Sequence, residues 1–320
     1  MNHKLSSFAA KYAMPLVLML LVLLMNFVRP DANLLSWENI KTILLQTSVL
    51  GFLALGLSFV MISGESDISF AGTLGMMSAT FTILSNRGMP FFLVLFIVMI
   101  IGMAFGVLIS FLVTRCGFSA FIISISVMFM GMGIERSYNE GVTIWLEPDP
   151  IKAIGRMQFG NVYILTWVML ILFVIAFFVI RSTLYGFQLR IIGENRLAGI
   201  EAGVKDRKVK ILAFIIAGAL FAVASATESI RIGGSIVGAG QSYMLPALTA
   251  CYLGSTMFTP GRVNIAGSFI GALFMNIISN FMQLMNLQYF FTPLAQGLVL
   301  LLAVGISVFK HRHEIQQCLV

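Results

Sequence analysis

Residues 43–63 read ILLQTSVLGFLALGLSFVMIS, a run without a charged side chain. An α-helix rises about 1.5 Å per residue, so a run of this length extends about 30 Å and can cross the hydrocarbon core of a bilayer. The rest of the chain has the same character, because 59% of its 320 residues are hydrophobic and only 10% are charged. A soluble domain carries about 25% charged residues. The sequence therefore predicts an integral membrane protein.

Ten apolar runs can be recognised along the chain. They cover residues 12–28, 43–63, 70–84, 91–113, 118–134, 163–180, 211–227, 244–258, 263–287 and 290–309. The third and eighth are short and rich in Gly, Ser and Thr, which indicates tilted, broken or partly re-entrant helices. The first lacks a small-residue cleavage signature, so we interpret it as a retained anchor rather than a signal peptide. The predicted fold is an all-α polytopic membrane protein with about ten transmembrane helices in a single domain, residues 1–320.

The distribution of positive charge predicts the orientation of the chain. If both termini are inside, thirteen of the 20 Lys and Arg residues fall on inside segments and seven on outside segments. Positive charge accumulates on cytoplasmic loops, so both termini are predicted to be cytoplasmic. The same distribution explains the net charge of +7 better than a nucleic acid partner does, because the basic residues form no patch.

The sequence contains none of the short motifs that carry common catalytic or metal chemistry. There is no GxxxxGK[ST], HExxH or GxSxG pattern, and the three histidines lie in the terminal tails. Cys116, Cys251 and Cys318 are far apart and form no zinc spacing. We therefore expect no catalytic residue, metal site or cofactor in this chain.

Ionisable residues are almost absent from the apolar runs, and the clearest exceptions are Glu65 and Asp67 between the second and third runs. A proton- or sodium-coupled carrier usually places ionisable residues inside its spans. The pattern argues against such a carrier and favours a pathway that is driven from outside the membrane.

The most charged segment of the chain lies between the sixth and seventh runs, at residues 181–210. Asn195 can cap a short helix that continues to Glu201, and Gly203 can end it. Its small residues lie near one side: Ala198, Gly199 and Ala202. Such a helix could dock closely into a groove on a partner; the alternative is a solvated basic connector.

This segment resembles the cytoplasmic loop of bacterial ATP-binding-cassette importer permeases of the ribose and related monosaccharide type. The matching positions are Thr183, Gly186, Leu189, Ile192, Gly193, Asn195, Ala198, Gly203 and Val204. Ile191 and Gly199 stand where the family usually has Ala. Three further stretches are similar to family patterns: residues 67–69 (DIS), 253–272 with its many glycines, and 296–299 (QGLV).

The resemblance implies the membrane-spanning subunit of an ATP-driven importer in the bacterial inner membrane, with a sugar or sugar-like solute; the family also handles the autoinducer signal. The implied partners are an ATPase subunit that binds ATP and Mg²⁺, a periplasmic binding protein, a second permease copy (identical or related) and membrane lipid. The coupling residues implied are Gly193, Glu194, Asn195, Ala198, Gly199, Glu201 and Gly203. The alternative function is a stand-alone secondary carrier or facilitator.

Four polar residues near or within the runs are candidates for the pathway or for a bend beside it. We expect Asp67 and Ser69 to cap the helix over the third run and to fix a bend, while Glu65 has no explanation. Asn276 and Asn280 lie on one face of the ninth run, where they could line a polar route or bond across helices. The GxxxG spacings at 102–106 and 267–271 predict close helix packing, with subunit pairing as the alternative.

Overall fold

The computed structural model describes residues 35–258, 261–288, 290–302 and 305. The chain divides into two compact units, which are described separately here. Residues 1–47 and 245–320 belong to unit 1, and residues 48–244 belong to unit 2. The boundaries fall inside two helices, α2 (Trp37–Ile62) and α11 (Ala239–Ser255), so each of these helices contributes to both units.

The described part of the chain is almost entirely helical. Unit 2 contains α3 (Phe70–Asn86), α4 (Phe91–Cys116), α5 (Ala120–Asn139), α6 (Asp149–Arg156), α7 (Ile164–Ser182), α8 (Leu184–Glu194), α9 (Arg196–Glu201) and α10 (Asp206–Ile232), and unit 1 contains α12 (Ile265–Leu284) and the helical residues Phe291–Leu302. Four two-residue strands occur in unit 2: β1 (Ile144–Trp145), β2 (Gln158–Phe159), β3 (Val162–Tyr163) and β4 (Gly234–Ser235). β1 pairs antiparallel with β4, and β2 with β3.

Six described helices are long and apolar enough to span a membrane: α2, α4, α5, α7, α10 and α12. Each predicted run from residue 43 onward coincides with a helix as far as residue 302, whereas the run 12–28 and most of residues 303–309 lie outside the described residues. The third and eighth runs form helices of 17 residues, and Pro246 lies inside the second of these, α11. The all-α polytopic fold is confirmed, while the count of ten spans and the location of the termini stay predictions.

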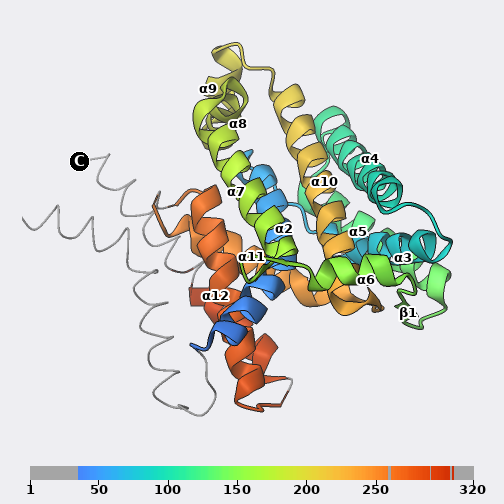
Figure 1. The fold of residues 1–320 in the computed structure, drawn as a ribbon. Coiled ribbons are helices and arrows are strands. Elements are labelled where there is room, and N and C mark those ends of the chain that lie inside the picture. Colours follow the sequence, from blue (N-terminus) through green and yellow to red (C-terminus); the bar gives the residue numbers. More distant parts are fainter. Residues whose placement is uncertain (1–34, 259–260, 289, 303–304, 306–320) are drawn as a thin grey trace, which may run out of the picture. The chain divides into compact units, whose positions relative to one another are not determined.

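The core of unit 2 forms where α10 packs on α4 and α3, and Figure 1 shows α4 and α10 side by side. α4 and α10 approach each other closely at Gly102 and Gly218, because a Cβ on either glycine would overlap the backbone of the other helix. Gly106 likewise lies against the carbonyl oxygen of Phe214. The first predicted GxxxG spacing therefore packs helices within the chain. A hydrogen bond of 2.8 Å between Ser78 and Ser229 adds a polar link between α3 and α10.

Unit 1 repeats this form of packing between α11 and α12. Gly267 and Gly254 exclude a Cβ from each other's positions, and Gly271 lies against the backbone of Ala250. The second GxxxG spacing is thus also a packing face within the chain. Asn264 caps the start of α12, because its side-chain oxygen accepts a hydrogen bond of 2.7 Å from the N–H of Gly267.

Candidate functional site

Residues 183–205, called the coupling loop here after the role that the resemblance implies, fold into two short helices whose capping residues belong to the same segment. The Thr183 hydroxyl accepts a hydrogen bond of 3.2 Å from the N–H of Gly186 and so begins α8. The Asn195 side chain accepts one of 3.1 Å from the N–H of Ala198 and begins α9. After α9, Gly203 has a φ of 83°, a left-handed conformation that glycine adopts readily. The predicted helix from Asn195 to Glu201 with a terminal glycine is confirmed.

The end of α8 lies directly against the end of α2. A Cβ on Gly193 would overlap the carbonyl oxygen of Ile62, and a Cβ on Gly64 would lie 3.5 Å from the Cα of Gly193. At the other end of α8, the Tyr185 hydroxyl donates a hydrogen bond of 3.5 Å to the carbonyl oxygen of Val209 on α10. A phenol is protonated at neutral pH, and burial raises the pKa of Tyr185 further, so this side chain is a donor. The loop is therefore attached to both α2 and α10.

Large apolar side chains of the coupling loop are exposed. Leu184 and Leu197 are 71% and 74% exposed, and Phe187 and Ile200 are also exposed. The small residues divide into two groups, because Gly199 is buried against the Ile192 side chain while Ala198 is exposed. Glu194 and Glu201 are exposed as well. The loop thus presents an apolar surface with acidic residues, and Gly199 holds α9 on α8 rather than facing outward.

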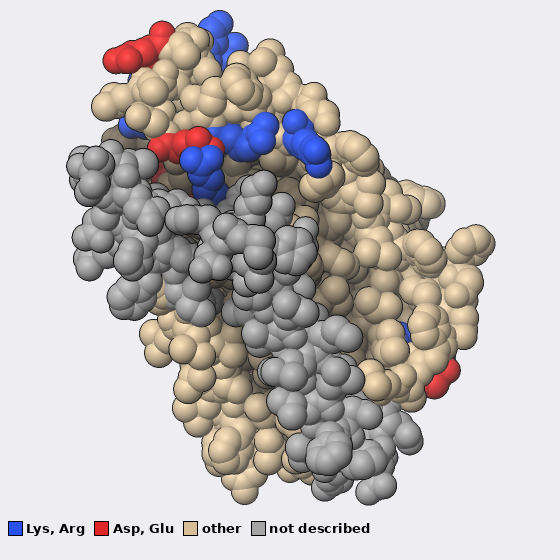
Figure 2. All heavy atoms as spheres, turned by 90° about the vertical axis from the view of Figure 1, so that its left-hand side faces the viewer, with Lys and Arg blue, Asp and Glu red and all other residues tan. Residues whose placement is uncertain are grey.

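A chain of charged side chains connects α9 to the turn between α2 and α3. Arg196 Nε lies 2.7 Å from Asp206 Oδ2. Lys210 Nζ lies 3.8 Å from Asp206 Oδ1 and 2.6 Å from Glu65 Oε1. Figure 2 shows charged side chains gathered at the upper end of the view, where α8 and α9 lie in Figure 1. Glu65, which the sequence left unexplained, is the partner of a buried lysine.

The Asp67 side chain binds the backbone just before α3, but the Ser69 side chain does not cap this helix. Asp67 is 2% exposed, and its Oδ1 accepts a hydrogen bond of 2.8 Å from the N–H of Ser69. Ser69 makes no side-chain capping bond, so its predicted capping role is wrong. Its φ of −58° and ψ of −30° are already helical, whereas a capping side chain needs an extended backbone to reach the first turn.

The space beside Asp67 is too small for a solute. A cavity of about 10 Å³ lies there, between α3, α4 and α10. Its lining residues are Asp67, Ser69, Thr73, Met77, Gly102, Phe105, Gly106, Gly218 and Phe221. Such a volume holds at most one water molecule. In this conformation Asp67 shapes the backbone and has no room to contact a sugar.

Asn276 and Asn280 belong to α12 in unit 1, so the four candidate pathway residues are not brought together in one compact unit. Asn280 exchanges hydrogen bonds of 2.9 and 3.1 Å with Asn39 on α2. Asn276 donates to the carbonyl oxygen of Ala272, one turn earlier on its own helix. Asn280 thus bonds across helices, the second of the two roles that the sequence left open.

The coupling loop and its attachments can be compared with known proteins. A sequence profile of the family described as the branched-chain amino acid transport system permease component matches residues 39–306. The chain belongs to this family. It is 28% identical to the ribose import permease protein of Haemophilus influenzae, over 95% of this chain and 94% of that protein. It is 30% identical to the ribose import permease protein of Bacillus subtilis, over 90% of this chain and 89% of that one.

A third relative extends the range of solutes named. The autoinducer 2 import system permease protein of Salmonella paratyphi B is 25% identical, over 92% of this chain and 85% of that protein. No solved structure matches the chain. The resemblance seen in the sequence is confirmed, and the chain is a multi-pass permease of the bacterial inner membrane.

At the C-terminal end of α10, far from the coupling loop, this permease has a second cluster of charged residues. The sequence analysis did not predict it. Glu228 accepts hydrogen bonds of 2.8 and 3.0 Å from Arg231 through one carboxylate oxygen. The Tyr243 hydroxyl lies 3.1 Å from both oxygens of Glu228 and 3.2 Å from Arg231 Nη2. The i, i+3 spacing of Glu228 and Arg231 could have predicted their ion pair from the sequence. Tyr243 comes from α11, so its contact with this pair could not be predicted.

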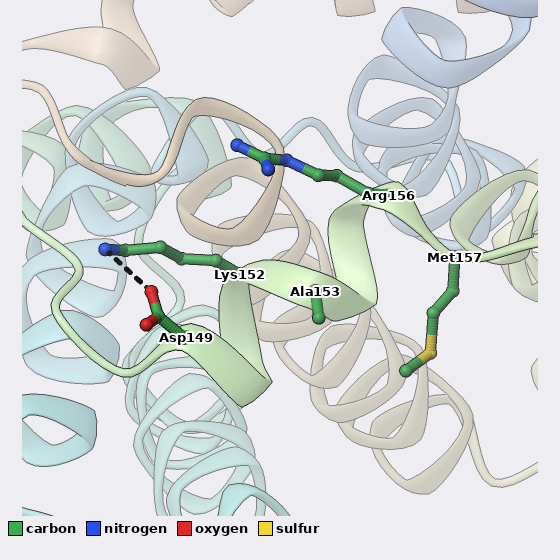
Figure 3. Close-up of a pocket in the computed structure, with 5 residues that line it drawn as sticks. All are labelled: Asp149, Lys152, Ala153, Arg156 and Met157. Atoms are coloured by element: carbon green, nitrogen blue, oxygen red, sulfur yellow. Dashed lines mark ion pairs between the residues drawn. The ribbon is translucent and has the colours of Figure 1, made fainter.

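The segments around this cluster form a covering layer of short elements. Asn86, at the end of α3, donates a hydrogen bond of 2.8 Å to the carbonyl oxygen of Trp145 on β1. Glu135 of α5 accepts one of 3.0 Å from the N–H of Gly238, after β4. An open hollow of about 520 Å³ lies against α6, lined by Asp149, Lys152, Ala153, Arg156 and Met157. Figure 3 shows Lys152 and Arg156 extending to the same side of α6, with Lys152 3.7 Å from Asp149.

Among the described residues, no group of three His, Cys, Asp or Glu side chains is placed to hold a metal ion. Within each cluster, the charged side chains form ion pairs with one another. The interactions that distinguish the described residues are these ion pairs and the close packing of helices at glycines.

Proposed function

We propose that this permease is the membrane subunit of an ATP-driven importer for a monosaccharide or a related furanosyl solute. The observation that carries the proposal is the coupling loop. Its exposed Leu197 lies on α9, which is attached to α10 through Arg196, and the preceding helix α8 is attached to α2 through Gly193. A loop built in this way can receive a partner and pass its movement to α2 and α10.

The partner at the coupling loop would be a cytoplasmic ATPase subunit. The exposed apolar side chains of α8 and α9 suit a groove on such a protein, since burial of a Leu side chain contributes about 1.5–3 kcal/mol. ATP and Mg²⁺ would bind to that subunit. This chain would carry out no bond chemistry and would form the pathway with a second permease copy, identical or related.

The far end of α10 would lie outside, where a periplasmic binding protein delivers the solute. The covering layer around β1, β4 and α6 and the hollow beside Lys152 and Arg156 support this assignment, because they offer charged, accessible groups. Asn276 and Asn280 remain candidates for the pathway in another conformation. The proposed solute follows the names of the relatives, whereas the family description names branched-chain amino acids.

Association with an ATPase subunit tests the first part of the proposal. The permease should co-purify in mild detergent with an ATP-binding-cassette ATPase subunit from the same cells. Leu197→Asp should abolish this association, because it places a charge in the proposed contact. Val142→Asp is the matched control: it makes the same change at a position that is 66% exposed but lies in the loop after α5. Equal retention of the ATPase by both variants would contradict the proposed contact.

Transport measurements test the remainder. In proteoliposomes, uptake of ribose should require the ATPase, ATP and a binding protein, and leucine should not replace ribose. ATP-independent uptake by the permease alone would instead identify a stand-alone carrier or facilitator. Uptake of leucine in place of ribose would keep the importer but overturn the proposed solute.

A further inference from the structure

Lys210 lies between two carboxylates that belong to different segments of unit 2. Its Nζ is 2.6 Å from Glu65 Oε1, in the turn between α2 and α3. It is 3.8 Å from Asp206 Oδ1, one turn earlier on α10. Only the shorter distance is within hydrogen-bonding range. In this conformation Lys210 therefore binds Glu65 and leaves Asp206 to another cation, Arg196.

We propose that Lys210 is a two-position switch between Glu65 and Asp206, and that the position of α9 sets it. The proposal rests on the proposed function, in which an ATPase subunit moves the coupling loop. When α9 moves away, Arg196 leaves Asp206, Lys210 binds Asp206 in its place, and Glu65 is released. A displacement of the coupling loop would thereby loosen residues 63–69, the joint between α2 and α3.

Lys210 would move from Glu65 to Asp206 because the buried Asp206 carboxylate needs a cationic partner. The Asp206 side chain is only 8% exposed, and its Oδ1 accepts no hydrogen bond from any described residue. A buried carboxylate that loses its partner is strongly destabilised. Lys210 follows Asp206 by four residues on the same helix, a spacing at which side chains are neighbours. A change of side-chain rotamer is therefore enough to satisfy Asp206 when Arg196 leaves.

The exposure of the four side chains makes both states accessible. Asp206 and Lys210, each 8% exposed, remain paired with a charge in either state. Both groups that lose their partner in the second state are more exposed: Arg196 is 63% exposed and Glu65 is 22% exposed. Water can solvate both of these at least in part. The two states can thus be close enough in free energy for a partner protein to shift the population between them.

Release of Glu65 would act directly on the bend that begins α3. Glu65 lies between the end of α2 and Asp67, whose carboxylate fixes the entry into α3. Gly193 of α8 touches the same turn through Ile62 and Gly64. The coupling loop thus reaches the joint by a steric contact and by an ion pair. Because the ion pair can exchange, it provides the switch.

Hydrogen–deuterium exchange on the full-length permease in nanodiscs tests the switch without any partner. Arg196→Gln should free Asp206 to take Lys210, so the backbone amides of residues 63–69 should exchange at least about fivefold faster. Asp206→Asn removes the competing anion, so Lys210 should stay on Glu65 and these amides should exchange no faster than in the wild type. A purely structural network would loosen the joint in both variants, and that result would overturn the switch.

The complete transporter gives a second test with opposite signs. Glu65→Gln and Arg196→Gln should raise basal ATP hydrolysis and lower the solute imported per ATP by about fivefold or more, because the joint is released. Asp206→Asn should instead lower both ATP hydrolysis and uptake, because the joint stays held. Lys210→Arg should retain coupling better than Lys210→Met. Changes of the same sign in Arg196→Gln and Asp206→Asn would refute the proposal.

Glu38→Gln is the matched control, because it removes an ion pair in unit 1. The distance from Glu38 to Lys41 is 2.7 Å, the same as from Arg196 to Asp206. It should leave the exchange of residues 63–69 and the coupling ratio unchanged. Failure of the wild-type permease to bind any ATPase would overturn the proposed function. The exchange experiment would still decide on the switch itself, so the two failures can be told apart.

Discussion

Gly193 at the end of α8 and Ile62 at the end of α2 are in backbone contact, and the carbonyl oxygen of Ile62 occupies the space that a Cβ on residue 193 would need. A carbonyl group in the last turn of a helix cannot move aside as the end of a flexible side chain can. The separation of the coupling loop from α2 is therefore set by the absence of a side chain at one position.

Gly193→Ala should displace α8 from α2 and weaken both stability and coupling. Overpacking of this kind costs about 1–3 kcal/mol in the free energy of unfolding. Thermal melting of the detergent-solubilised permease and ATP-driven uptake measure the two effects. Gly133→Ala on α5 is the control, because no atom lies within 4 Å of its added Cβ; it should be neutral or stabilising by up to about 1 kcal/mol. Equal behaviour of the two variants would contradict the close contact.

Gly102→Leu should disrupt the packing of α4 on α10 far more than Ala104→Leu on the same helix. Gly102 lies against the backbone of Gly218, whereas Ala104 is exposed on the apolar surface of α4. We expect a loss of about 1–3 kcal/mol or failure to fold for the first variant, and no loss for the second. Size-exclusion chromatography and thermal melting would show the difference. Normal folding of Gly102→Leu would place this glycine outside the packed interface.

The sequence was sufficient for the features that depend on local pattern. Apolar runs located the described helices other than α6, α8 and α9, and the cap at Asn195 followed from residues within one turn of it. It could not supply the partner of Glu65, because Lys210 is 145 positions away. Ser69 was assigned wrongly because its residue type favours a cap, while its backbone had already entered the helix. Long-range pairing and backbone angles are properties of the folded chain.

Asp67→Ala should slow import without altering the choice of solute. It removes the acceptor of the Ser69 N–H bond, a change comparable to the loss of a helix cap, which costs about 1 kcal/mol. Asp67→Asn retains a side-chain oxygen and should be milder. Uptake rates for ribose and for competing sugars would be compared across the three proteins. A clean change of sugar preference at full rate would show that Asp67 binds the solute instead.

Glu228→Ala should destabilise the permease more than Tyr243→Phe does. The first variant leaves the Arg231 guanidinium without its carboxylate, which costs about 3 kcal/mol for a buried pair. The second removes one hydroxyl group, with a loss of about 1 kcal/mol. Asp149→Asn, at a side chain that is 95% exposed, should cost less than about 1 kcal/mol. Thermal melting would rank the three, and a larger loss for Tyr243→Phe than for Glu228→Ala would contradict the described cluster.

The two charged clusters of α10 also have a consequence for the surrounding lipid. No charged residue lies between Lys210 and Glu228, and this part of the helix rises about 27 Å, close to the about 30 Å of a bilayer hydrocarbon core. Each cluster ties its end of α10 to neighbouring segments, so the helix cannot adapt to a thicker membrane by sliding along its axis. Uptake should therefore fall in proteoliposomes made from longer-chain lipids, so the thickness of the host membrane sets a condition on transport.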